Sequence, residues 1–408
     1  MVIPAGEFAE RRRRAAREAS QRGLDGLLVW GRGGSLDAFS DVHYFSNHYS
    51  PMVWVPPLPG VLSGCEHSAL LIEPDGSGTL FVSDFCSVEA QVDRVRRGWD
   101  LTAELVSHLV EIGADGSRLG AVGEEVLPFG VVTGLTEALP ALRLVPADEI
   151  SSQLRLRLSE SEVAMLVRAG EVGRSIYAEF LAHVVQGVSE GEAVGAAIRL
   201  AAQIPGCMHW NFISASGPDA DALVRSSIPP WKPDRTYSAG DVVHADCFGY
   251  VDGYCYDLAR TVVIPGDTAS RAVAVADATA EAVQEVAGAL RPGVTSRELC
   301  EMAQRALATR GLSSAGGSFG HGIGAGFFRP YLVPAGPDLD LAIEPPFGMS
   351  IELFATDGEE GYAYHEDNYV VLERETICLT EGAPLTEGPS RRDRSARARR
   401  SDTRFGSP

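Results

Sequence analysis

The feature that most constrains the fold of this chain is an internal repeat in its second half. Residues 187–192 (GVSEGE) and 293–298 (GVTSRE) share the pattern G-V-[ST]-x-x-E, and each follows a long amphipathic helical segment. A Ser or Thr three residues before a Glu is typical of a capping box at a helix start. Each copy then runs into a β-rich stretch. A chance match of six residues is the alternative, but the shared order of elements favours two copies of a helix–helix–antiparallel hairpin unit, over 159–266 and 267–380.

The first half instead alternates predicted helices and strands, which is typical of an α/β domain. A charged helix is expected over 7–22, followed by a buried strand that begins at Leu24. Pro74-Asp75-Gly76 predicts a hairpin turn, and further helices are expected near 87–98 and 101–112.

Three segments follow from this organisation. We expect an N-terminal α/β domain over 1–153, a catalytic domain over 154–385 and a disordered, Arg-rich tail over 386–408. A solvated tail is the simplest interpretation, and contact with nucleic acid is the alternative.

Composition excludes several classes of partner. The 408 residues carry 55 acidic and 35 basic side chains, a net charge of −20, which argues against binding nucleic acid or an anionic membrane by bulk charge. Seven cysteines without a CxxC motif fit a reducing compartment. With no apolar signal core at residues 1–5 and no run of 18 apolar residues, we expect a cytoplasmic, soluble protein.

Paired acids interrupt the apolar strands of both predicted hairpins. Asp246 and Asp257 flank the turn Asp252-Gly253 and are expected opposite or nearly opposite each other, with side chains about 5 Å apart. Glu352 and Glu366 are equidistant from the centre of the second turn. Close carboxylates repel each other unless a proton or a cation lies between them. One strand Asp alone would be read as a cap or an edge charge, but four acids in matched positions of a repeat favour a site.

His321 completes this candidate site. It lies in the glycine-rich segment 320–324 (GHGIG), where small neighbours leave the imidazole uncrowded. One imidazole with four carboxylates is a hard, oxygen-rich donor set. It suits two divalent ions such as Mn, Co, Fe or Zn with a water between them.

These residues resemble the superfamily of creatinase, Xaa-Pro aminopeptidase, prolidase and methionine aminopeptidase, family M24. The resemblance spans about residues 8–382 and includes the helix that follows Arg157. The most specific matching segments are Asp246-x10-Asp257-Leu-Ala-Arg260-Thr261, Gly320-His321-Gly-Ile-Gly324, Gly348-Met349-Ser-Ile-Glu352 and Glu366-Asp367.

The resemblance implies an α+β fold: a pita-bread catalytic domain built from the duplicated unit, preceded by a creatinase-like N-terminal α/β domain. It also implies a homodimer, and a hydroxide that bridges two divalent metal ions as the nucleophile. Glu352 would serve both as a ligand and as the general acid/base. The implied metal ligands are Asp246, Asp257, His321, Glu352 and Glu366.

The chain departs from the resemblance around the substrate. Arg225 and Phe328 stand where the peptidases have two further histidines. Arg225 adds a fixed positive charge suited to a substrate carboxylate, whereas Phe328 cannot relay a proton. Alternatively, His209 supplies the missing imidazole. His244 shares a strand face with Asp246 and is a further candidate substrate contact or a structural residue.

Two smaller departures lie next to the ligands. Leu353 replaces the Pro that often follows the Glu ligand, and Tyr364 replaces an Arg near the last ligand. The metal-binding residues are thus retained while the residues around the substrate differ.

Three classes of function remain open: a hydrolase, a lyase and a non-catalytic binding module. The leading hypothesis is a dinuclear metal-dependent hydrolase that cleaves a C–N bond in a small, carboxylate-bearing substrate or short peptide. An Xaa-Pro dipeptidase or aminopeptidase is the nearest alternative, and a metal-dependent lyase on the same fold is the next. A non-catalytic binding module is a third class, and the five retained ligands argue against it.

Overall fold

The chain divides into two compact units in a computed structural model, Met1–Arg157 and Leu158–Pro408. The structure describes residues 3–34, 39–50, 52, 61–62, 65–84, 88–217, 220, 228–266, 270–359 and 361–381, apart from the side chains of 209, 210 and 270. The predicted tail over 386–408 lies outside these residues. The predicted domain boundary between residues 153 and 154 falls within the helix Asp148–Arg155.

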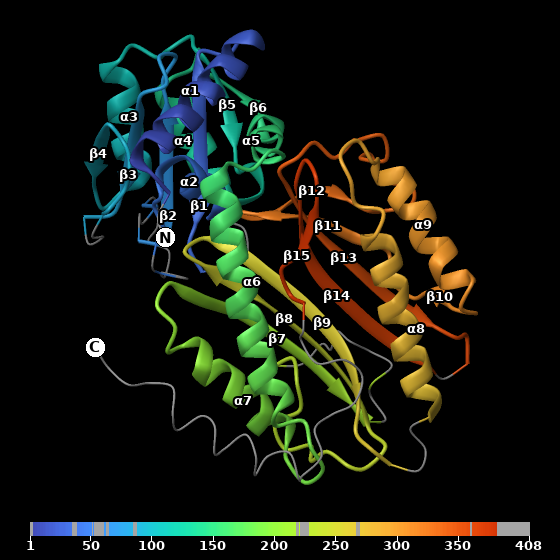
Figure 1. Cartoon of the computed structure of the whole chain (residues 1–408). Helices are drawn as coiled ribbons and strands as arrows, with labels where there is room; N and C mark the ends of the chain where they lie inside the picture. The colour runs from blue at the N-terminus through green and yellow to red at the C-terminus, as the bar shows by residue number, and fades with distance from the viewer. Residues whose placement is uncertain are drawn as a thin grey trace, which may run out of the picture. The chain divides into compact units, whose positions relative to one another are not determined.

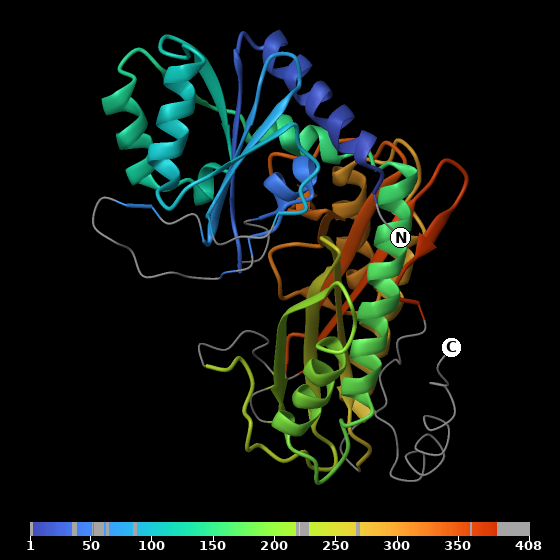
Figure 2. The ribbon, with the colours of Figure 1, turned by 90° about the vertical axis from the view of Figure 1, so that its left-hand side faces the viewer.

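The first unit is a six-stranded sheet with helices on both faces, which gives an α/β architecture (Figures 1 and 2). The strand order is β4-β3-β2-β1-β5-β6, with β1 antiparallel to β2 and parallel to β5. Its elements, in chain order, are α1 (Ala5–Gln21), β1 (Gly26–Arg32), α2 (Ser40–Ser46), β2 (His67–Ile72), β3 (Gly78–Val82), β4 (Arg94–Arg97), α3 (Leu101–Glu111), β5 (Arg118–Val122), η1 (Glu124–Val126), α4 (Phe129–Ala138), β6 (Arg143–Pro146) and α5 (Asp148–Arg155).

One hydrophobic cluster of this unit lies between the sheet and the helices α3 and α4. Trp30 and Phe81 of the sheet pack with Leu105 of α3 and Leu135 of α4, and all four side chains are fully buried. Burial of apolar surface of this kind is the main stabilising contribution to such a layer. In Figure 2, α1 covers the sheet on the side opposite to α3 and α4.

One expected helix of this unit was wrong. The segment predicted as helical over 87–98 contains β4 at Arg94–Arg97, which pairs in parallel with β3. The strand lies at the sheet edge and most of its side chains are exposed. An exposed edge strand lacks the alternation of apolar and polar residues that identifies a strand in a sequence.

The second unit is a sheet whose described strand pairings are all antiparallel, with its two longest helices on one face (Figure 1). The main strand order is β12-β11-β13-β14-β9-β8-β7, with β10 on β13 and β15 on β14. Helix α6 packs on β8 and β9, and α8 packs on β13 and β14. The elements are α6 (Glu160–Leu181), α7 (Glu190–Ala201), β7 (Cys207–Ser216), β8 (Val242–Val251), β9 (Tyr254–Val263), α8 (Ser270–Ala287), α9 (Ser296–Ala308), β10 (Ser313–Ser314), β11 (Gly320–Gly324), β12 (Gly326–Tyr331), β13 (Phe347–Thr356), β14 (Tyr362–Val371) and β15 (Thr376–Cys378).

This unit confirms the predicted duplication. Ser189 caps α7 and Thr295 caps α9, each in a complete capping box with the Glu three residues later. Each capping residue also forms an isolated antiparallel bridge, Ser189 to Thr236 and Thr295 to Ala342. The hairpins β8–β9 and β13–β14 then lie side by side at the centre of the sheet, joined by the pairing of β9 with β14.

The predicted Asp-Gly turn between β8 and β9 is also confirmed. Asp252 has φ of 50° and Gly253 has φ of 86°, the left-handed pair that a tight hairpin turn requires. The turn sets the register of the hairpin, with Val251 opposite Tyr254. Among the described residues, every helix is too short or insufficiently apolar to span a membrane.

Candidate metal centre

Strand register brings the four predicted acids to one face of the sheet. Glu352 of β13 is directly opposite Glu366 of β14, as the sequence predicts. Glu366 is opposite Ala259 of β9, which is in turn opposite Asp246 of β8. Asp257 lies two residues before Ala259, so it shares this face and is a diagonal neighbour of Asp246.

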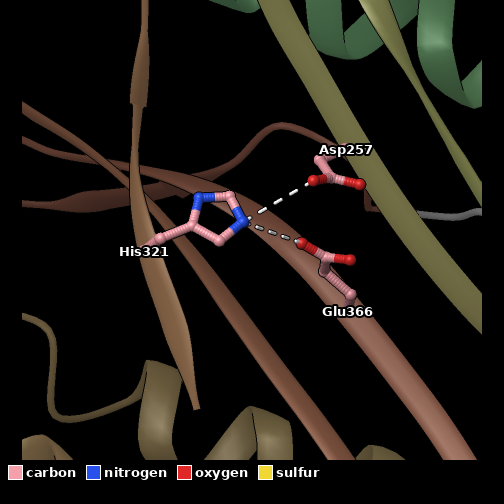
Figure 3. A group of neighbouring side chains, drawn as sticks. All are labelled: Asp257, His321 and Glu366. Atoms are coloured by element: carbon pink, nitrogen blue, oxygen red, sulfur yellow. Dashed lines mark ion pairs between the residues drawn. The ribbon is translucent and has the colours of Figure 1, made fainter. Parts of the chain in front are cut away.

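His321 of β11 reaches the same face. It pairs with Ser350, two residues before Glu352, so both side chains point to the side of the acids. His321 Nε2 is 3.6 Å from Asp257 Oδ2 and 3.7 Å from Glu366 Oε1 (Figure 3). The ligand atoms of Asp257, His321 and Glu366 all lie within 4.8 Å of one another, a spacing that fits a shared metal ion.

Burial makes this cluster electrostatically unfavourable without a cation. Asp246, Asp257 and His321 are each less than 9% exposed, and Glu366 is fully buried. Burial, followed by the charges of neighbouring carboxylates, raises the pKa of Asp246 and of Glu366 well above the usual range. Burial also raises the pKa of Asp257. Burial alone lowers the pKa of His321, but the acceptor carboxylate of Asp257 and the charges of the nearby acids favour the protonated imidazole and raise its pKa to about 9.

Two carboxylate oxygens in the cluster are without a hydrogen-bond partner among the residues that the structure describes. Asp246 Oδ1 and Asp257 Oδ1 are buried and unpaired. A buried unpaired charged oxygen is costly, and a divalent cation removes that cost. The donor set of one imidazole and several carboxylates therefore fits a divalent metal ion.

A layer of hydroxyl groups orients the glutamates; the sequence marked Tyr364 only as a departure near the last ligand, and it did not single out Ser350. Ser350 Oγ donates to Glu366 Oε1 at 2.6 Å. Tyr364 Oη is 2.8 Å from Glu352 Oε2 and 3.0 Å from Glu366 Oε2. Both hydroxyls lie at alternate positions of the strands that carry the acids, which is the signal in the sequence that would have found them.

The opposite face of the same strands carries a buried ion pair. Arg260 Nη2 is 2.5 Å from Asp367 Oδ1, and His365 Nε2 is 3.0 Å from Asp367 Oδ2. Arg260 also donates to the backbone carbonyl of Glu366. Although burial opposes it, the charge of Arg260 holds the pKa of Asp367 well below its usual range. This ion pair fixes the backbone from which Glu366 projects.

The structure corrects two of the predicted substrate contacts. Phe328 pairs with Gly322, so its ring lies on the face of the strand opposite to His321. The side chain is 5% exposed there, and its ring centroid is 5.9 Å from that of Phe347. Phe328 is therefore a core residue. The ring beside the imidazole belongs to Phe327, with its centroid 5.0 Å from that of His321.

His244 is the second correction. Its side chain is fully buried, and Nδ1 shares a hydrogen bond of 2.7 Å with Thr261 Oγ1. Burial lowers its pKa to about 4, so it is neutral at neutral pH. Complete burial leaves no surface for a substrate to contact. The other two predicted contacts, Arg225 and the side chain of His209, lie outside the described residues.

The fold and the site together define a metallohydrolase, and the sequence identifies its family. Residues 164–373, more than half of the chain, match metallopeptidase family M24, and residues 11–157 match the creatinase/prolidase N-terminal domain. The chain belongs to metallopeptidase family M24, as its resemblance implied. It is therefore a metal-dependent, peptidase-like hydrolase with a creatinase-type N-terminal domain and a pita-bread catalytic domain.

Individual relatives are similar over different lengths. An uncharacterized peptidase, YqhT of Bacillus subtilis, is 27% identical over 337 residues, which cover 78% of this chain and 90% of that protein. A Xaa-Pro dipeptidase of Pyrococcus horikoshii is 25% identical over 49% of this chain and 56% of its own length. The crystal structure of dipeptidase PepE from Mycobacterium ulcerans has the same fold, with a TM-score of 0.75 at 23% identity over 96% of this chain and 100% of that one.

Proposed function

We propose that Asp246, Asp257, His321, Glu352 and Glu366 hold two divalent cations, and that the protein hydrolyses the C–N bond of a small substrate that bears a carboxylate. The observation that carries this proposal is the convergence of four acids and an imidazole on one face of adjacent strands, with two carboxylate oxygens left unpaired. Mn, Co, Fe and Zn all suit such a donor set.

The chain's own residues divide the chemistry between them. Divalent cations held at this site would lower the pKa of a neighbouring water and polarise the scissile carbonyl. Glu352 is the one acid of the five residues with a partly exposed side chain, whereas the other ligands are buried. We assign it the proton transfer: it accepts a proton from the attacking water and delivers it to the leaving nitrogen as the C–N bond breaks.

The substrate's carboxylate is proposed from the sequence, because Arg225 offers a fixed charge with bidentate geometry. Xaa-Pro dipeptides are the second candidate substrates, favoured by the relative named as a Xaa-Pro dipeptidase. A homodimer and a cytoplasmic location are further proposals. Light scattering of the purified protein tests the first of these.

Product analysis tests the reaction. The purified protein is stripped of metal and reloaded with Mn²⁺ or Co²⁺. It is then incubated with Xaa-Pro dipeptides and with small N-substituted amides that carry a carboxylate, and the masses of the products are measured by mass spectrometry. Hydrolysis gives two products whose summed mass equals the substrate plus one water, whereas elimination adds no water.

The control for this test is Glu352→Gln, which removes the proton carrier while keeping the side-chain shape. We expect metal-dependent hydrolysis that this variant loses. If Ala-Pro is turned over at the rate of the best substrate, Xaa-Pro peptides become the proposed substrate class in place of the carboxylate-bearing amides. No metal-dependent turnover of either substrate class, or elimination products, would overturn the proposed function.

A further inference from the structure

Tyr364 lies inside the candidate metal centre and contacts two of its proposed ligands. It precedes Glu366 by two residues on β14, so its side chain points to the same face, and it is 6% exposed. Its hydroxyl is 2.8 Å from Glu352 Oε2 and 3.0 Å from Glu366 Oε2. These two glutamates are directly opposite each other on β13 and β14. The phenol therefore bridges the central pair of acids.

The bridge leaves a defined oxygen of Glu366 facing the imidazole. With Oε2 of Glu366 in contact with the phenol, Oε1 is the oxygen that lies 3.7 Å from His321 Nε2. Ser350 fixes that second oxygen from the other side. Both oxygens of Glu366 are thus held by neutral hydroxyl groups, and neither hydroxyl adds positive charge that would compete with a cation.

Tyr364 is itself held by a buried network. Its backbone N–H donates to Thr261 Oγ1 at 2.7 Å, and Thr261 Oγ1 also contacts its carbonyl at 3.2 Å. Thr261 in turn shares a hydrogen bond with the buried His244. The ring of Phe354 packs edge-on against the Tyr364 ring, with centroids 5.9 Å apart. The phenol is therefore locked in place before any ligand arrives.

We propose that Tyr364 is a positioning residue that orients Glu352 and Glu366 toward the bound cations, and that Thr261 and His244 hold Tyr364 in register for this task. The inference rests on the proposed function, because it requires cations on this face. Hydrogen-bond partners that orient metal ligands typically contribute a factor of about 10–100 to metal affinity or activity. The phenol acts here as a neutral donor and stays outside the set of metal ligands.

The test compares Tyr364→Phe with Tyr362→Phe, a matched control on the same strand and face. Tyr362 stacks on Phe354 through its ring, which Phe retains. Mn²⁺ and Co²⁺ affinities of the full chain are measured by calorimetry or by competition with a chelating dye. We expect Tyr364→Phe to bind Mn²⁺ and Co²⁺ about 10–100-fold more weakly than the unaltered chain. The affinity of Thr261→Val should lie between these two, and the affinity of Tyr362→Phe should equal that of the unaltered chain.

A second measurement separates positioning from direct ligation. Cation binding should perturb the tyrosine absorbance of the unaltered chain, and Tyr364→Phe should abolish that change. Metal affinity equal to that of the unaltered chain in Tyr364→Phe would overturn the inference, and so would the longer-wavelength absorbance of a tyrosinate on metal binding. If the unaltered chain binds no cation, the proposed function fails first, and the inference fails with it.

Discussion

Phe328 gives the sharpest prediction, because the sequence and the structure assign it different roles. The sequence placed it against the substrate, whereas the structure buries its ring against one face of the paired strands β11 and β13. The packing around the ring of Phe328 is tight. A Cβ built on Gly322 would lie 2.8 Å from Cδ2 of Phe328, and a Cβ built on Gly324 would lie 2.9 Å from its Cε1. We therefore expect Phe328→Ala to behave as a core truncation.

The magnitude follows from that packing. Truncating a buried Phe to Ala costs about 3–5 kcal/mol of unfolding free energy. For a unit of this size each kcal/mol lowers the melting temperature by about 2–4 °C, so the expected loss is about 6–20 °C. Calorimetric melts and steady-state kinetics of the folded fraction measure both effects. Phe327→Ala is the control, since Phe327 is partly exposed beside His321 and its loss should reduce kcat/KM more than stability.

The variant Phe328→Leu distinguishes a core residue from a substrate contact. Phe328→Leu keeps an apolar side chain in the core and should retain most of the activity while it lowers the melting temperature. A Phe328→Leu variant with an unchanged melting temperature and a kcat/KM reduced by more than about tenfold, which corresponds to about 1.4 kcal/mol, would restore Phe328 to the substrate site.

Three further predictions concern charge. Arg260→Met should destabilise the protein by about 3–5 kcal/mol because Asp367 stays buried without its cation, and adding Asp367→Asn should recover part of the loss in denaturant titrations. Glu352→Gln should lower kcat by about 10²–10⁴-fold with little change in the metal-free melting temperature, and an unchanged kcat would contradict its role in proton transfer. In metal-free protein, His321 keeps its proton up to a higher pH than it does in the unfolded chain, because its pKa is raised to about 9. Its contribution to the free energy of unfolding should therefore be fully present below about pH 6.5 and lost as the pH rises through about 9. Melts with and without added cation test this, since bound cations should flatten the slope.

Much of the site was predictable because strand periodicity acts over short distances in the chain. The Asp-Gly turn fixes the register of β8 and β9, and the equal spacing of Glu352 and Glu366 from their turn makes them direct partners. The capping boxes of α7 and α9 marked the two copies of the repeat for the same reason. These signals depend on local geometry that a few residues determine.

The misassigned residues depended on geometry that one sequence does not carry. The bulge in the β11–β12 pairing next to His321 decides which of two adjacent phenylalanines faces the imidazole. A register shift of one residue exchanges the two faces of a strand, and the adjacent pair Phe327 and Phe328 does not itself specify that shift. Likewise, the environment that buries His244 includes Phe354, which lies far from it in the chain.

The metal content of the purified protein shows whether the five residues hold two divalent cations. The full chain and the Asp257→Asn variant are loaded with Mn²⁺ or Co²⁺, freed of excess metal and measured by elemental mass spectrometry. We expect two divalent ions per folded chain and a clear loss in Asp257→Asn, because Asp257 lies within reach of both His321 and the other acids. A folded chain that retains no divalent metal, or an Asp257→Asn variant that retains as much as the unaltered chain, would contradict this expectation.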